Sequence, residues 1–237
     1  MSAVLGIDTA TGFVSVTVMR GQELVWETSQ APGEDGRPRH TELLLEAVED
    51  GVRTAGGWEQ IRRIAIGLGP GSYTGLRIGI ATARGLAQAR RIPIAGVGTL
   101  AALARGMLEH ERAAGRPALA VIDARRTEAF AALYAPDGEQ VWTPFVASPD
   151  ELADRVRGLA DSPLAAGDGS LRFRQQLEGA GAIIAAPDDP VHRISARHIC
   201  ALGAGDEVSP PHPIRPMYLR APDAEKWLER DQRQFSG

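Results

Sequence analysis

The sequence predicts an α/β protein made of two halves, and three observations support this. Each half begins with β-rich runs that are separated by turns of hairpin length. In each half, short apolar runs then alternate with segments whose apolar residues recur at helical spacing. The chain has 237 residues and is 43% hydrophobic but 5% aromatic, so its core must consist mainly of Ala, Leu, Ile and Val. Two α/β units fit this order better than one continuous parallel sheet.

The first half opens as a β-meander. Its β-rich runs and the turns between them are 4–7, Thr11-Gly12, 13–19, Arg20-Gly21-Gln22 and 24–28. In the second run, Phe13, Ser15 and Thr17 alternate with valines. This alternation is typical of a strand with one buried face.

Helices and strands alternate after the meander. Residues 31–39 are rich in Pro, Gly and charge, and they predict a loop. Leu44, Val48 and Val52 form one apolar line on a predicted helix over 40–54. The elements expected next are a strand over 64–68, a glycine-rich turn, a helix over 75–90, a strand over 93–97 and a helix that Thr99 caps and that runs to about Glu111.

The second half repeats the strand-rich opening. Strands are expected over 117–122, 129–134 and 140–146, with the turn Pro136-Asp137-Gly138 before the last. Ser148 and Glu151 form a capping box around Pro149, which predicts a helix start. The remaining expected elements are a strand over 164–166, a second glycine turn, a helix over 171–178 and a helix from Ser195 through Leu202.

This order of elements predicts where the halves divide. They should meet near residues 100–115, with an N-terminal domain of residues 1–105 and a smaller C-terminal domain of residues 106–212. The tail, 213–237, should return to the first domain.

Composition excludes several classes of protein. The formal net charge is −4, so a scaffold that binds nucleic acid by bulk positive charge is disfavoured. Cys200 is the single cysteine, so the chain forms no internal disulfide and no cysteine-based metal cluster. The first residues resemble no signal peptide and no apolar run is long enough to span a bilayer, so we expect a cytoplasmic protein that does not enter a membrane.

The glycine-rich turn could hold a phosphate, because a glycine turn that opens a helix presents free N–H groups. No lysine follows it, which excludes a Walker A motif, and its spacing is not the dinucleotide fingerprint. Asp8 ends the first strand beside hydroxyl residues and could face this turn. The candidate nucleotide-like cleft comprises Asp8, Thr9, Thr11, Gly69, Gly71, Ser72, Gly167 and Gly169. The alternative is that Asp8 and Thr9 merely cap a hairpin.

Catalytic and metal-binding patterns are missing from the sequence. The five histidines form neither an H-x-x-x-H nor an H-E-x-x-H motif. Ser72 lies in no G-x-S-x-G elbow, and no Ser/His/Asp set is evident. We therefore predict no catalytic residue and no metal ligand.

The predicted helix over 75–90 carries small residues four positions apart, which would let another helix approach closely. The helix over 40–54 also has more apolar width than one core face needs. Both features favour a partner surface, although packing against the chain's own sheet is the alternative. The expected contact residues are His40, Leu43, Leu44, Ala47, Val48, Leu76, Arg77, Gly79, Ile80, Ala83 and Ala87.

Several segments together resemble the TsaB (YeaZ) family. They are Gly6-Ile7-Asp8-Thr9, residues 39–44, the glycine-turn segment 67–79, residues 96–100, Ile122-Asp123-Ala124-Arg125-Arg126 and residues 216–220. They span most of the chain, and segment 67–79 is the most specific. The resemblance implies an actin/hexokinase/Hsp70-like (ASKHA) fold of two related α/β domains.

The resemblance also implies a function. TsaB proteins are non-catalytic relatives of TsaD, which carries an H-x-x-x-H metal motif on the helix that corresponds to 40–54. This chain has His40 there, but Leu44 stands four residues later. The resemblance implies pairing with TsaD through the two N-terminal helices and a possible homodimer through the same surface. The complex with TsaD also recruits the ATPase TsaE.

The expected role is thus a scaffold subunit that binds and activates TsaD, in a complex that installs threonylcarbamoyl on adenosine 37 of ANN-decoding tRNAs. The chain itself would need no cofactor, since ATP and Mg²⁺ belong to the complex, and tRNA would be met only through the complex. Two alternatives remain: an ATP-dependent phosphotransferase or ATPase of the same fold, and a metal-dependent peptidase.

Overall fold

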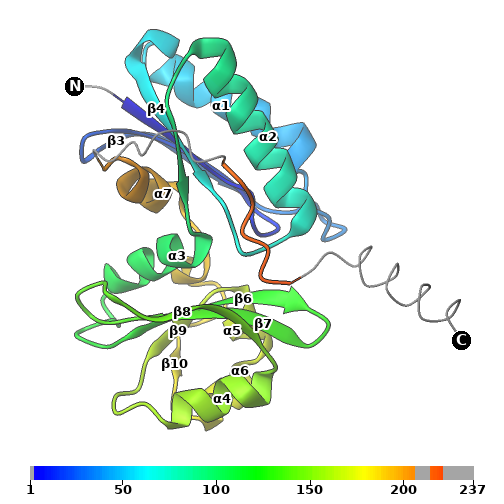
Figure 1. Ribbon diagram of the computed structural model, residues 1–237, viewed down its shortest axis with the longest axis vertical. Helices are drawn as coiled ribbons and strands as arrows, with labels where there is room; N and C mark the ends of the chain where they lie inside the picture. Colours follow the sequence, from blue (N-terminus) through cyan, green and yellow to red (C-terminus); the bar gives the residue numbers. More distant parts are fainter. Residues whose placement is uncertain (1–2, 206–213, 221–237) are drawn as a thin grey trace, which may run out of the picture.

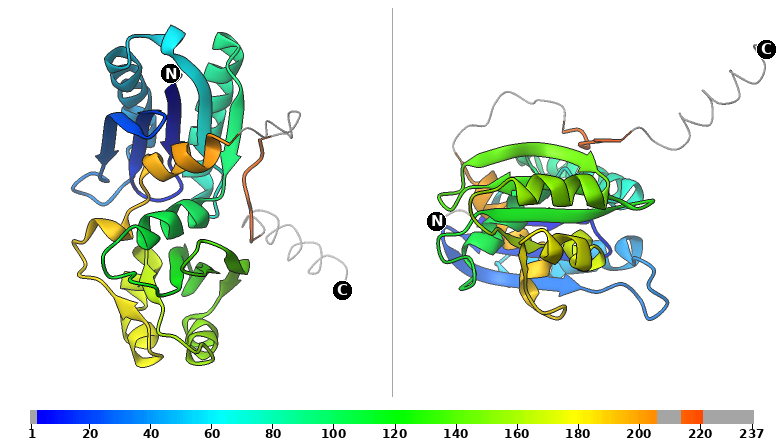
Figure 2. Two further views of the ribbon diagram at one scale, coloured as in Figure 1. Left: turned by 90° about the vertical axis from the view of Figure 1, so that its left-hand side faces the viewer. Right: turned by 90° about the horizontal axis from the view of Figure 1, so that it is seen from below.

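The computed structural model describes residues 3–205 and 214–220, which form two mixed β-sheets with helices between and outside them. Figure 1 shows the layers from top to bottom: a layer of helices, the first sheet, a second layer of helices, the second sheet and a third layer of helices. The same layers are visible from the side (Figure 2). The predicted two-unit α/β architecture is therefore confirmed.

The first sheet contains β1 (Ala3–Asp8), β2 (Val14–Arg20), β3 (Glu23–Gln30), β4 (Ile61–Gly67) and β5 (Ile94–Val97). Its order is β3-β2-β1-β4-β5; the meander strands are antiparallel, and β4 pairs in parallel with β1 and β5. Helices α1 (His40–Thr54) and α2 (Tyr73–Arg90) cover one face, and together with that face they enclose an apolar core. The short 3₁₀ turn η1 (Trp58–Gln60) leads into β4.

The other face of this sheet is covered by α7 (Ala196–Gly203). The backbone N–H of Ala196 donates to the Ser15 hydroxyl at 2.8 Å, and Ser15 and Thr17 are both buried. The prediction that this strand has one buried face is therefore wrong, because a helix nearly two hundred residues later covers the polar side as well.

The second sheet repeats the order of the first. It contains β6 (Ala118–Arg125), β7 (Glu128–Tyr134), β8 (Gln140–Ala147), β9 (Leu164–Ala166) and β10 (Ile183–Ile184), in the order β10-β9-β6-β7-β8. Again a three-stranded meander is followed by two parallel strands. Helices α4 (Pro149–Arg157), α5 (Asp168–Arg172) and α6 (Arg174–Gly179) lie on its outer side.

Helices α3 (Thr99–Leu108) and α7 occupy the layer between the sheets. Their apolar residues join side chains from both sheets in one continuous core, which includes Ala65, Leu103, Ile122 and Ile199. The predicted division assigned α7 to the C-terminal domain, yet α7 packs against the first sheet. A single domain boundary near residue 105 therefore separates the first sheet from α7, one of the helices that cover it.

Several predicted boundaries need correction. Thr99 is the first residue of α3 and not its cap; its hydroxyl points to Asp8 instead, and α3 ends at Leu108. The helix expected over 171–178 is two short helices, α5 and α6, that meet at Phe173. The predicted capping box at Ser148 and the predicted cap at Ser195, by contrast, are confirmed. The 3₁₀ turn η2 (Pro190–His192) precedes α7.

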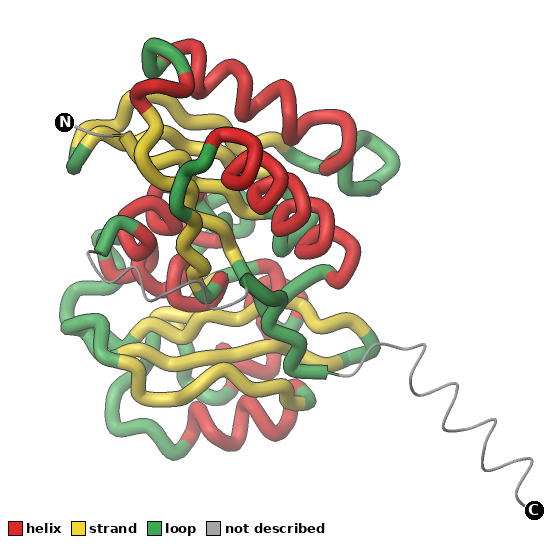
Figure 3. Tube along the Cα trace, turned by 45° about the horizontal axis from the view of Figure 1, so that its top comes forward, coloured by secondary structure: helices red, strands yellow, loops and turns green. Residues whose placement is uncertain are grey.

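Residues 214–220 form an extended segment, here called the strap, that passes from the first sheet to the second half (Figure 3). Ile214 packs against the core under α1 and α2, whereas Leu219 packs against the core between the sheets. The tail is expected from the sequence to return to the first domain. The strap contacts that domain and also the core between the two sheets. The remaining tail residues lie outside the described part of the chain.

None of the helices within residues 3–205 and 214–220 combines the length and the apolar character that a bilayer span requires.

Candidate functional site

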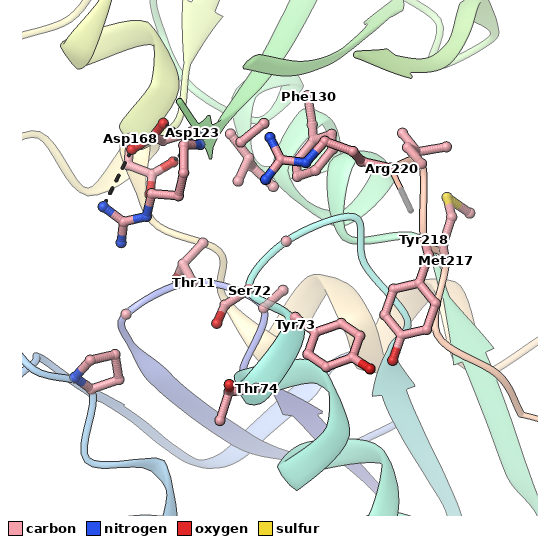
Figure 4. A pocket seen from close by; sticks show the side chains of 18 residues that line it. Thr11, Ser72, Tyr73, Thr74, Asp123, Phe130, Asp168, Met217, Tyr218 and Arg220 are labelled. Atoms are coloured by element: carbon pink, nitrogen blue, oxygen red, sulfur yellow. Dashed lines mark hydrogen bonds and ion pairs between the residues drawn. The ribbon is translucent and has the colours of Figure 1, made fainter. Parts of the chain in front are cut away.

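A cleft of about 450 Å³ lies between the two halves. Figure 4 shows its walls: the start of α2 and the β1–β2 turn on one side, the end of β6 and the start of β7 on the other, and the strap. Of the predicted cleft residues, Thr11, Gly71 and Ser72 line it. Asp123, Arg125, Phe130, Asp168 and Tyr218 line it as well, and we did not predict them as site residues.

The glycine turn brings the start of α2 against the β1–β2 turn. The Ser72 N–H donates to the Ala10 carbonyl at 2.7 Å, and the Ser72 hydroxyl caps α2 by accepting the Gly75 N–H. A Cβ on Gly71 would collide with the Ala10 backbone, and Gly69 has a positive φ of 99°. The glycines are therefore explained by close backbone packing and a turn, whatever the cleft holds.

Asp8 lies beneath the cleft and not in its wall. Its carboxylate accepts hydrogen bonds from the Ala10 N–H at 2.9 Å and the Thr99 hydroxyl at 3.2 Å, and only 2% of the residue is exposed. Burial raises the pKa of the Asp8 carboxyl to about 6, although both hydrogen bonds lower it. Thr9 is buried too, and its hydroxyl donates to the Gly75 carbonyl at 2.8 Å. Both residues therefore make buried hydrogen bonds within the first half and do not line the cleft.

Asp123 occupies the corresponding place in the second half. It accepts the N–H of Arg125 at 2.8 Å, just as Asp8 accepts the N–H two residues later. Arg172 contacts both oxygens of Asp123, at 2.8 and 2.7 Å, and Asp168 accepts the Asp123 N–H at 2.9 Å. A sequence signal for this site existed: the first strand of each meander carries an Asp at or near its end, before a hairpin turn.

The β6–β7 turn beside Asp123 has an unusual backbone. Arg125, Arg126 and Thr127 have φ values of 64°, 51° and 60°, which L-residues other than Asn and Asp seldom adopt. This turn carries Arg125 to the rim of the cleft, 3.5 Å from the Asp123 carboxylate.

Gly167 and Gly169 lie behind the wall. A Cβ on either residue would collide with the backbone of β6, and Gly167 has a φ of 108°. These glycines let α5 start directly against the sheet, and Asp168 between them reaches the cleft.

The predicted partner residues are placed mostly inside the chain. Seven of them belong to the apolar core between α1, α2 and the first sheet, or lie directly at its edge: Leu44, Ala47, Val48, Leu76, Ile80, Ala83 and Ala87. A Cβ on Gly79 would collide with Thr9, so this glycine serves an internal contact. The row of small residues is therefore not an accessible surface, which corrects our expectation for these positions. Leu43 is half-buried and Arg77 is exposed.

His40 is also buried, at the start of α1, where its ring lies against Gly75 of α2. Its Nε2 atom has no hydrogen-bond partner among the described residues, and burial lowers the pKa of the imidazole. Four residues later, Leu44 is 2% exposed in the core. In the part of the chain that the structure describes, no group of three or more His, Cys, Asp or Glu side chains could hold a metal ion.

Comparison with known proteins places the chain in a family. The family model "TsaD: tRNA N6-adenosine threonylcarbamoyltransferase" matches residues 33–179. The TsaB protein of Escherichia coli is 35% identical over 171 residues, which are 70% of this chain and 71% of that protein. The TsaB protein of Bacillus subtilis is 29% identical over 95% of this chain and 98% of its own length.

Solved structures agree with these relatives. YeaZ from Pseudomonas aeruginosa has a TM-score of 0.74 and 25% identity over 92% of this chain and 100% of its own. The ROK hexokinase from Thermus thermophilus has a TM-score of 0.51 and 14% identity over 86% of this chain and 100% of its own, so it is alike in fold alone. These neighbours confirm the predicted actin/hexokinase-like fold. Sequence relatives and structures together show that the chain belongs to the TsaB (YeaZ) family.

Proposed function

We propose that this chain acts in the biosynthesis of threonylcarbamoyladenosine in tRNA, the process for which its Escherichia coli and Bacillus subtilis relatives are named. In this role it is a non-catalytic subunit that docks on TsaD and activates it. The observation that carries the proposal is the start of α1, where TsaD proteins carry two metal-binding histidines. This chain has His40 there, but Leu44 in place of the second histidine.

A metal-binding helix face needs two ligands one turn apart. Here Leu44 takes the second position and is buried in the core, while the His40 ring is enclosed against α2. No second imidazole can join His40 on that face. This arrangement supports a scaffold over a metal-dependent transferase or peptidase.

The docking surface is proposed to be the outer side of α1 and α2, whose inner side is occupied by the first sheet. Leu45 on α1 is 53% exposed, and Ala81 on α2 is exposed. Around them α1 presents the acidic residues Glu42, Glu46 and Glu49, and α2 presents Arg77 and Arg84. Exposed apolar residues on both helices, with charges of both signs around them, suit a specific partner helix pair.

The burial of residues on α2 decides which substitution can test docking. Ala83 is 0% exposed, so Ala83→Glu would bury a charge in the core and unfold the chain before it could test an interface. Leu45→Glu is the better variant, and Val141→Glu on β8 is its matched control, because Val141 is also 53% exposed. We expect Leu45→Glu to weaken TsaD binding by about tenfold or more, as for a central interface residue. Titration calorimetry with purified TsaD measures this; equal affinities for both variants would exclude this surface.

The wider assembly is proposed on the same basis. TsaE joins once TsaD is bound, tRNA is met through the complex, and a homodimer uses the same helix surface when TsaD is absent. Reconstituted tRNA modification with and without this chain tests the role as a whole. Full modification by TsaD and TsaE alone would reject it.

The principal alternative is an ATP-dependent phosphotransferase or ATPase that uses the cleft. Asp8 at the end of β1 and Asp123 near the end of β6 are the natural Mg²⁺ ligands for such chemistry. Both are engaged within the chain, Asp8 by Ala10 and Thr99, and Asp123 by Arg172. Binding and turnover of Mg-ATP by the isolated chain, measured by calorimetry and phosphate release, would favour the enzyme.

A further inference from the structure

We propose that the strap, residues 214–220, is a clasp that fixes how far the cleft between the two halves opens. The strap runs beside the cleft and contributes Met217, Tyr218, Leu219 and Arg220 to its wall. It holds both halves through specific contacts. A change in the separation of the walls at this point must therefore break or stretch them.

On the first half, the strap is held by backbone and aromatic contacts. The Met217 N–H donates to the Leu68 carbonyl at 2.7 Å, just after β4. The centres of the Tyr218 and Tyr73 rings lie 5.1 Å apart, and Arg77 Nε donates to the Tyr218 hydroxyl at 3.2 Å. The Arg77 guanidinium also lies 4.0 Å from the centre of the Tyr73 ring. Figure 4 shows the two tyrosines side by side at the start of α2.

On the second half, two residues later, the strap is held by a charge pair and an apolar contact. Arg220 Nη1 donates to Glu128 Oε2 at 2.8 Å, and the Arg220 side chain is only 19% exposed. Leu219 packs against the core between the sheets. A partly buried ion pair is screened less by salt and water than a surface pair, so it can hold a position.

The strap contacts are placed where they can resist a change in the separation of the two halves. The two halves share a continuous core around α3 and α7, which joins them permanently. In Figure 1 the strap runs on the right of the molecule, away from α7. Leu219 packs against this shared core, whereas the Tyr218 and Arg220 anchors are polar and aromatic contacts to α2 and to Glu128. These two anchors are the ones that resist a change in the width of the cleft. Loss of the strap anchors should therefore widen the cleft without unfolding either sheet.

The experiment measures the separation of the halves with spin labels on the full chain. Labels are attached at Thr41→Cys on α1 and Thr143→Cys on β8, both exposed positions. Cys200 is buried in the folded chain, with 1% of the residue exposed, so it is shielded from the labelling reagent. Double electron–electron resonance then gives the distance distribution between the two labels.

The test variant combines Glu128→Gln with Tyr218→Ala, which removes one anchor on each half. We expect a broader distribution shifted to longer distances, and amide hydrogen exchange at Met217 faster by about tenfold or more. Arg215→Ala, at an exposed strap position, is the control and should leave both readouts unchanged. A distribution that coincides with that of the parent chain would overturn the clasp.

Two further variants keep the result interpretable. If the combined variant loses its folded circular dichroism spectrum, Glu128→Gln alone takes its place and must still widen the distribution. The exchanged pair Glu128→Arg with Arg220→Glu should restore the parent distance, because it rebuilds the ion pair with its charges reversed. A charge exchange that stays as wide as Glu128→Gln would contradict the role of this pair as an anchor.

Discussion

At the scale of single residues, Asp8 and Asp123 show how the same local motif can stand in two different environments. Each lies at or near the end of the first strand of a meander and accepts the N–H two residues later. Asp8 is sealed beneath the cleft with the Thr99 hydroxyl, whereas Asp123 meets the guanidinium of Arg172. The surroundings, and not the motif, decide which carboxylate lies under the cleft and which lies in its wall.

The raised pKa of Asp8 predicts a pH-dependent stability. Its folded pKa of about 6 lies above the ordinary value of 3.8, so the folded chain binds the proton more tightly than the unfolded chain does. The stabilising contribution is full below pH 3.8 and is lost as the pH rises through about 6.

Asp8→Asn should remove this dependence. Relative to the parent chain, the variant should gain about 2 kcal/mol in unfolding free energy between pH 4 and pH 7, which is most of the free energy that the pKa shift represents. Urea denaturation at several pH values measures the difference. Asp161→Asn, at an exposed position, is the control. A parallel pH profile for Asp8→Asn and the parent would contradict the burial of an ionisable Asp8.

At the scale of elements, α2 shows why a row of small residues is ambiguous. Gly75 and Gly79 are small because the β1–β2 turn and His40 lie against them. Gly85, on the same helix, is exposed and has nothing within 4 Å of the position of a Cβ. The spacing alone could not distinguish a partner helix from the chain's own turn, because both demand small side chains.

Two substitutions on α2 should therefore have opposite signs. Gly79→Ala should lower the free energy of unfolding by about 1–3 kcal/mol, because its methyl group collides with Thr9. Gly85→Ala should raise it by about 0.5–1 kcal/mol, because alanine favours the helix and meets no neighbour. Thermal and urea unfolding of the two variants measure both effects. Stabilisation by Gly79→Ala would show that α2 and the β1–β2 turn do not pack so closely.

At the scale of the whole molecule, the halves are less separate than the sequence indicates. Each has its own sheet with the same strand order, but α7 returns from the second half to cover the first sheet. The core between the sheets then binds both units around α3 and α7. The two halves therefore repeat each other in topology, while α7 and the shared core join them into one molecule.

This joint predicts that the first domain, as the sequence delimits it, does not fold alone. A fragment of residues 1–105 lacks α7 and would expose the face of β1, β2 and β4 that α7 covers. We expect a poorly dispersed ¹H–¹⁵N spectrum and no cooperative thermal transition, in contrast to the full chain. A well-dispersed spectrum with a sharp transition would show that α7 is dispensable for the first sheet.

Much of the element order could be predicted from the sequence, because it rests on local physics. The 3.6-residue period of Leu44, Val48 and Val52 gives α1, and the capping box at Ser148 gives the start of α4. The family is also determined by the sequence, through the long segment around the glycine turn.

What covers each face was decided only by the tertiary structure. The alternation in β2 records that the valines are buried, but it carries no information about α7, which comes nearly two hundred residues later and buries Ser15 and Thr17. In the same way, helical spacing identified the apolar side of α1 and α2 without stating that the first sheet occupies it. Local patterns depend on the chain's own period, whereas the cleft, the strap and the joined halves depend on contacts between distant segments. Such contacts leave no periodic trace in the sequence.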